Sequence, residues 1–168
     1  EGVVFFTHLN ARLQNVKNTS LSPADSLTLF ATARFLDSAR VSHRMRESYH
    51  DSLAGFILIT QVSPFHTSIL NPILEPLAAV KFQSGFIDTL YMAGIGREYL
   101  SFGRMKFFYK GLKVDIRNPY DTGRHTLGTQ IMKFAANNFV IRSRNTRRTG
   151  QVYYERHRDK AIFNYWVK

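Results

Sequence analysis

The histidines are candidate metal-binding or catalytic residues, because imidazole binds metals and exchanges protons near neutral pH. No two histidines have the HExxH or HxH spacing that places two imidazoles on one ion. The chain also has no cysteine, which excludes thiolate ligands, a thiol nucleophile and disulfides. The sequence therefore predicts no metal site and no cofactor. The six histidines are His8, His43, His50, His66, His125 and His157.

General acid–base catalysis needs two carboxylates, or a carboxylate and a histidine, that converge in a cleft. The 12 acidic residues are instead spread among turns and the polar sides of strands. His50 and Asp51 are adjacent, but neighbours on a strand point to opposite faces. Glu155 and Asp159 stand among basic residues, where we expect local ion pairs. We predict no catalytic residues and a protein that is not an enzyme.

Positive charge dominates the chain, with a net charge of +11, and most of it falls after residue 84. A basic stretch near the end is interleaved with Tyr153 and Tyr154, and binders of single-stranded nucleic acid combine basic grooves with stacking aromatics. An anionic membrane surface fits the same charge, and nucleic acid is the disfavoured partner. The predicted basic surface comprises Arg142, Arg144, Arg147, Arg148, Arg156, Arg158 and Lys160.

The elements that carry these residues follow a hydrophobic period of two, which is typical of strands with one apolar and one wet face. A phase reset at Gly111 predicts a bulge or bend. We predict strands over residues 7–16, 25–35, 39–49, 55–62, 78–94, 102–118, 139–145 and 152–157. Short helices are expected near 66–75, 126–136 and 159–168.

These elements predict a mainly β protein, a single domain over residues 1–168. One long, twisted antiparallel sheet carries about three short covering helices. Three short helices can cover only a small part of the apolar strand faces. Two alternatives therefore stay open: an open, taco-like groove, or an ordinary core filled by the chain's own side chains. The candidate groove lining is Leu27, Leu29, Ala31, Ala33, Phe35, Val41, Met45, Met105, Phe107, Tyr109, Leu112, Val114 and Ile116.

The last expected helix carries an apolar face of its own. Ile162, Phe163 and Trp166 lie on one side of it, and they either cover the groove as a plug or lie at a membrane surface. We favour packing over the groove, because an isolated helix of about ten residues is marginal without tertiary support.

Several long segments resemble, in order, the C-terminal region of large AsmA-like envelope proteins of Gram-negative bacteria. They are "LNPILEPLAAVKFQSGFIDTL", "GRMKFFYKGLKVDI", "FAANNFVIRSRN" and "VYYERHRDKAIFNYWVK", with "NARLQNVKN" earlier in the chain. The resemblance implies a parent protein anchored in the inner membrane, whose long, curved sheet extends through the periplasm with an apolar groove. Because members of that family are much longer, we expect this chain to be a piece of a longer protein.

The resemblance also implies a function. It predicts a non-enzymatic periplasmic module involved in phospholipid transport between membranes and in outer-membrane integrity, acting as a groove segment or end cap. The implied partners are phospholipid acyl chains and the rest of the parent β-sheet. The alternative is a nucleic-acid-binding module that uses the Arg-rich stretch over residues 142–160.

Overall fold

The computed structural model describes residues 2–19, 21–53, 55–116 and 143–155. Alternating side chains dictate extended elements over most of this range. The strands are β1 (Phe6–Gln14), β2 (Ser26–Phe35), β3 (Ala39–Ser48), β4 (Phe56–Val62), β5 (Phe65–His66), β6 (Val80–Gly96), β7 (Leu100–Ile116) and β8 (Thr149–Glu155).

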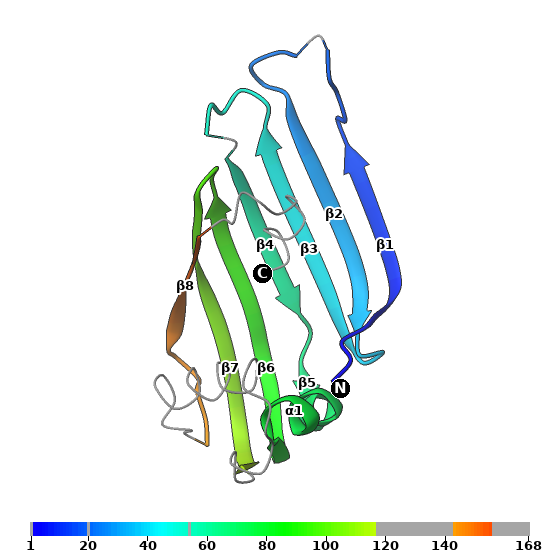
Figure 1. The fold of residues 1–168 in the computed structure, drawn as a ribbon, viewed down its shortest axis with the longest axis vertical. Coiled ribbons are helices and arrows are strands. Elements are labelled where there is room, and N and C mark those ends of the chain that lie inside the picture. Colours follow the sequence, from blue (N-terminus) through cyan, green and yellow to red (C-terminus); the bar gives the residue numbers. More distant parts are fainter. Residues whose placement is uncertain (1, 20, 54, 117–142, 156–168) are drawn as a thin grey trace.

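The strands form one antiparallel sheet in the order β1-β2-β3-β4-β6-β7-β8, and β5 pairs with β6 beside this path (Figure 1). Neighbours in the sheet are therefore consecutive strands, as in a meander, except between β4 and β6, where β5 and the helical segment intervene. The sheet is open, with β1 at one edge and β8 at the other. The predicted mainly β fold with a long antiparallel sheet is confirmed.

Two short helices follow β5 and lie on one side of the sheet. The 3-10 helix η1 (Thr67–Leu70) leads directly into α1 (Asn71–Ala78). The Asn71 amide fixes α1 to the start of β6: its Nδ2 donates to the Phe82 carbonyl at 2.9 Å, and its Oδ1 accepts from the Phe82 N–H at 2.8 Å. These helices match the one expected near 66–75, and the helices expected near 126–136 and 159–168 lie outside the described residues.

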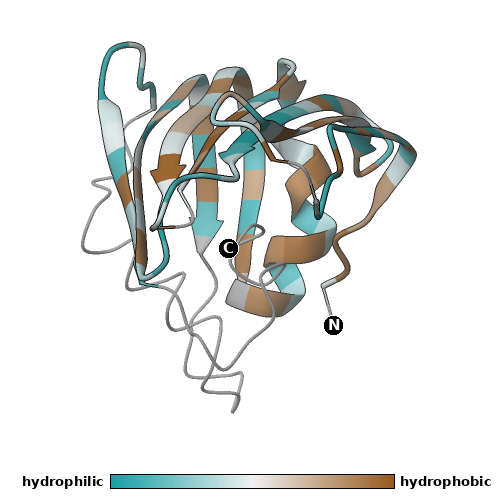
Figure 2. Cartoon of the chain, turned by 90° about the horizontal axis from the view of Figure 1, so that it is seen from above, coloured by the Kyte–Doolittle hydropathy of each residue, from teal (hydrophilic) through white to brown (hydrophobic). Residues whose placement is uncertain are grey.

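The sheet is arched, and α1 sits under the arch at one end (Figure 2). The change in the phase of hydrophobic alternation at Gly111 contributes to this arched shape. Its backbone has φ 62°, and the β6–β7 register shifts between Phe82 and Phe86, opposite this stretch of β7. The predicted bulge is confirmed. Because the bulge inserts residues on one strand, Leu112 faces the same side of the sheet as Tyr109 and packs with it.

Apolar packing forms two clusters on the side of the sheet that carries α1. The first, next to α1, has Ala39, Phe65, Ile87 and Tyr109 at its centre. The second lies toward the other end and is built on Met45 and Phe56, with Leu29, Leu58 and Tyr154 against them.

Candidate functional site

The cross-strand register decides which side chains share the face that α1 covers at one end. Residues directly opposite each other on paired strands lie on the same face. We call this the groove face. One apolar row crosses it from β1 to β8: Leu13, Leu29, Met45, Leu58, Gly94, Gly103 and Val152.

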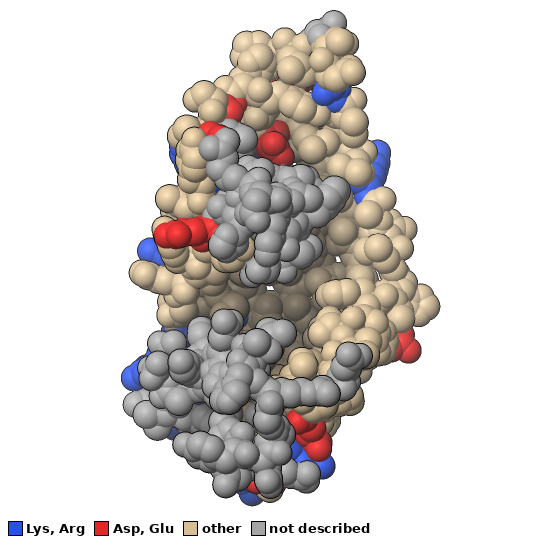
Figure 3. Space-filling view, in the orientation of Figure 1, with Lys and Arg blue, Asp and Glu red and all other residues tan. Residues whose placement is uncertain are grey.

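A second apolar row runs closer to α1. It consists of Ala33, Val41, Val62, Leu90 and Phe107 on five successive strands. Together the two rows place hydrocarbon on the groove face across the width of the sheet. Figure 3 shows this face hollowed, with the floor of the hollow tan and most charged atoms nearer the outline.

Glycines leave part of the groove face without side chains. Gly94 and Gly103 pair across β6 and β7, and a Cβ at Gly103 would lie 2.5 Å from the Ala93 carbonyl oxygen. Gly96 lies under the Phe56 ring, which occupies the place of a Cβ at that position. The two long strands therefore approach closely where the sheet bends.

The structure places the predicted lining residues in three groups. Ala33, Met45 and Tyr109 are buried, with Met45 only 1% and Tyr109 only 2% exposed, so they act as core. Val114 pairs with Phe82 near α1, and Ile116 pairs with Val80 at the end of β7. The remaining ones are half-buried on the groove face: Leu27, Leu29, Ala31, Phe35, Val41, Met105, Phe107 and Leu112.

A polar pair that the sequence analysis did not single out lies between the two apolar rows. His43 on β3 and Thr60 on β4 are cross-strand partners, and the His43 Nδ1 is 2.9 Å from the Thr60 Oγ1. Burial lowers the pKa of His43 below its ordinary value, because the charged imidazolium loses water. The hydrophobic run from Phe56 to Val62 reads as apolar on both sides, so only the register reveals on which face Thr60 lies.

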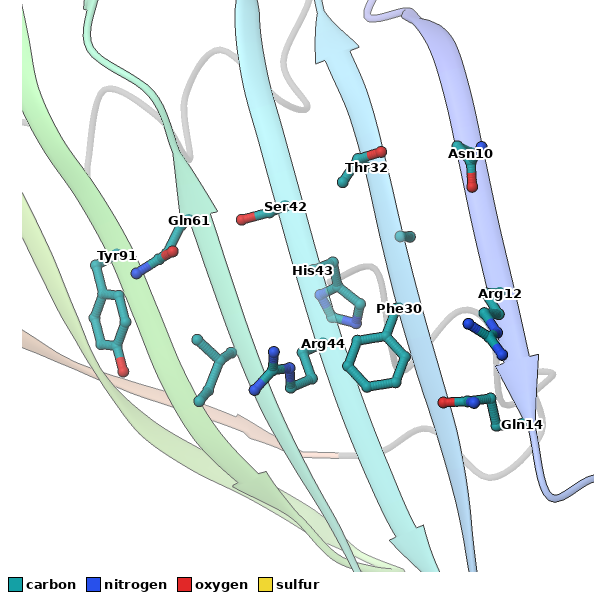
Figure 4. Close-up of a pocket in the computed structure, with 12 residues that line it drawn as sticks. Asn10, Arg12, Gln14, Phe30, Thr32, Ser42, His43, Arg44, Gln61 and Tyr91 are labelled. Atoms are coloured by element: carbon teal, nitrogen blue, oxygen red, sulfur yellow. The ribbon is translucent and has the colours of Figure 1, made fainter.

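The opposite face, which we call the outer face, is polar and basic. A depression of about 730 Å³ crosses it from β1 to β6. Arg44 lies 5.0 Å from the centre of the Phe30 ring (Figure 4). The Lys106 Nζ lies 5.6 Å from the centre of the Tyr91 ring. The side chains that line the depression from the outer face are Asn10, Arg12, Gln14, Phe30, Thr32, Ser42, Arg44, Ile59, Gln61 and Tyr91.

Only part of the predicted basic surface can be placed. Arg144, Arg147 and Arg148 are exposed in the segment just before β8. Asn145 holds this segment to β7 through a bridge to Tyr109, and both backbone N–H···O distances are 2.8 Å. The other predicted basic residues, Arg142, Arg156, Arg158 and Lys160, and the predicted closing-helix residues Ile162, Phe163 and Trp166, lie outside the described residues.

Residues 2–19, 21–53, 55–116 and 143–155 hold neither a metal cluster nor a membrane-spanning helix. No three His, Asp or Glu side chains in them gather as they would around a metal ion. None of the helices in this part of the chain has the length and hydropathy needed to span a bilayer. Comparison of the chain with protein-family models, curated proteins and solved structures yields no match.

Proposed function

We propose that this chain is a non-enzymatic, lipid-handling module of the periplasm, which binds phospholipid acyl chains along the groove face. The observation that carries the proposal is the pair of apolar rows that cross the concave side of an open, arched sheet. In this proposal the chain belongs to an AsmA-like parent protein anchored in the inner membrane. It contributes to phospholipid transport between membranes and to outer-membrane integrity.

The groove face suits hydrocarbon in chemistry and in shape. Burying an acyl methylene stabilises a complex by about 0.8 kcal/mol, so the roughly 8 kcal/mol of micromolar binding needs about ten methylenes buried on these rows. Met92 and Met105 lie opposite each other on β6 and β7, and unbranched thioethers adapt to chains of differing shape. The α1 end is packed, so the chain acts as a groove segment with one end capped.

Native mass spectrometry of the purified chain, followed by organic extraction, tests this proposal. We expect co-purified phospholipid in the wild type and its loss in Leu29→Asp, which places a carboxylate in the apolar row. Ile57→Asp is the matched control, because Ile57 is 55% exposed and lies on the outer face. Circular dichroism checks that both variants fold. A lipid-free wild type, or equal loss in both folded variants, would contradict the proposal.

A second candidate function, binding of single-stranded nucleic acid, is favoured by the outer face. The basic side chains there lie over aromatic rings, and the exposed arginines just before β8 extend the positive charge. The Arg-rich stretch over residues 142–160 would form the rest of this surface.

Salt dependence separates this candidate from an apolar site. If the outer face binds phosphates, the logarithm of the affinity for a single-stranded oligonucleotide should fall linearly with the logarithm of the salt concentration. The magnitude of this slope should be smaller by about 0.7 in Arg44→Gln. Thr28→Gln, on the same face of β2, serves as a neutral control. Binding that is absent at 50 mM salt would exclude the candidate.

A further inference from the structure

The middle row of the groove face differs in kind from the rows on either side of it. Five strands contribute small or flexible apolar residues to this row, and only its centre, on β3 and β4, is polar. The row reads Ala11, Ala31, His43, Thr60, Met92, Met105 and Gly150 from β1 to β8.

The central pair is accessible and electrically neutral. His43 and Thr60 are both half-buried, so neither is sealed in a core. Desolvation depresses the pKa of His43, which keeps the imidazole uncharged at neutral pH. The nearest acidic residue on the same face of β3 is Glu47, four residues away, or about 13 Å along a strand. The pair therefore offers hydrogen bonds without charge.

The imidazole has one ring nitrogen to offer to a ligand. Among the described residues, its hydrogen bond is the one between Nδ1 and the Thr60 hydroxyl. When that hydroxyl donates to Nδ1, the ring proton lies on Nε2, which then becomes a donor. The Nε2 donor would have apolar side chains on either side of it along the strands. It therefore suits an uncharged hydrogen-bond acceptor within an otherwise apolar ligand. A phosphate would have to leave water for an apolar surface, which is costly.

We propose that His43, oriented by Thr60, donates a hydrogen bond to the ester carbonyl of an acylated lipid in the groove. The inference rests on the proposed lipid-binding function and adds the ligand's linkage chemistry to it. The flanking residues provide room for this: Ala31 on β2 is small, and Met92 on β6 is flexible. The polar pair thus fixes the position of the lipid along the groove, while the apolar rows supply the affinity.

The test is a competition between two lipids that differ only in linkage. Ester-linked dioleoyl phosphatidylglycerol and its ether-linked dialkyl counterpart are mixed equally in vesicles, and the bound lipid is identified by native mass spectrometry. We expect the wild type to prefer the ester roughly threefold to tenfold, the range that one hydrogen bond gives. Thr60→Val, which keeps the shape but removes the hydroxyl, should reduce that preference, and His43→Leu should abolish it while both lipids still bind.

The outcomes separate this inference from the function on which it rests. Equal binding of ester and ether lipids by the wild type would overturn the ester contact and leave the groove intact. A preference that survives in both variants would overturn the role of the pair. Failure of the wild type to bind either lipid would overturn the groove proposal, and the ester contact with it. Should His43→Leu not fold, Thr60→Val decides the question alone.

Discussion

At the residue scale, the fold lowers the pKa of His43, and this shift affects stability near neutral pH. Its imidazole is half-buried between apolar rows and bonded to Thr60, and desolvation lowers its pKa below the value of about 6.5 expected in an unfolded chain. As the pH falls below about 6.5, the unfolded chain therefore binds a proton at His43 more readily than the folded chain does. The contribution of the neutral His43 to the free energy of unfolding is thus present above this pH and is lost as the pH falls.

We accordingly expect the free energy of unfolding to decrease as the pH is lowered from 7.5 to 5.5. The decrease should be smaller in His43→Leu, which has no proton to bind at this position. Asp25, whose pKa is lowered mainly by a hydrogen bond from the Ser22 backbone and by Lys17, titrates below this window and does not contribute to it. Urea unfolding at the two pH values measures the difference. Identical slopes in the two proteins would show that His43 is not the group responsible.

At the scale of elements, the Asn71 amide provides the side-chain hydrogen bonds that attach α1 to β6. Asn71 exchanges two hydrogen bonds with the Phe82 backbone, and Lys81 and Glu75 form an ion pair nearby at 3.1 Å. That pair is partly exposed, and exposed ion pairs contribute little. Ile73 is buried and supplies an apolar contact of the helix.

Asn71→Ala should therefore destabilise the chain by about 1–3 kcal/mol, because it leaves the Phe82 N–H and carbonyl without their partners. Hydrogen exchange should accelerate first in α1 and at the start of β6. Gln83→Ala is the control, because Gln83 is exposed one residue further along β6. If the two variants have the same stability, the amide bonds do not hold the helix in place.

At the scale of the whole molecule, the sheet ends in an edge that is still apolar. Leu9 and Leu13 on β1 are 70% and 57% exposed, and an edge strand also presents unpaired backbone groups. Such an edge is a template for a further strand. The rest of the parent β-sheet is the partner that we propose for it, and in isolation a second copy of the chain can take its place.

Sedimentation velocity should therefore show concentration-dependent association of the isolated chain. Leu13→Lys should shift it toward the monomer, because a lysine on the edge opposes strand addition. Ile57→Lys changes a side chain of similar exposure, 55%, on a central strand and should have little effect. A wild type that stays monomeric at all concentrations would contradict the expectation.

The sequence by itself determined the elements and their two faces. Alternating side chains predicted β2, β3 and β7 almost to their ends, and the reset at Gly111 predicted the bulge that returns Leu112 to the groove face. These features are local, because a strand's side chains alternate whatever lies beside them. The prolines and short apolar turns around residues 66–75 likewise predicted the helical segment formed by η1 and α1.

Only the tertiary structure decided which side chains meet across strands. The run from Phe56 to Val62 is apolar at most positions, so periodicity could not assign Thr60 to a face or pair it with His43. The close approach of Gly103 to Ala93 and the stacking of Arg44 over Phe30 are equally invisible in the chain. The reason is physical: a one-residue shift in register moves a whole strand's side chains to the other face, and turns and distant packing set that register.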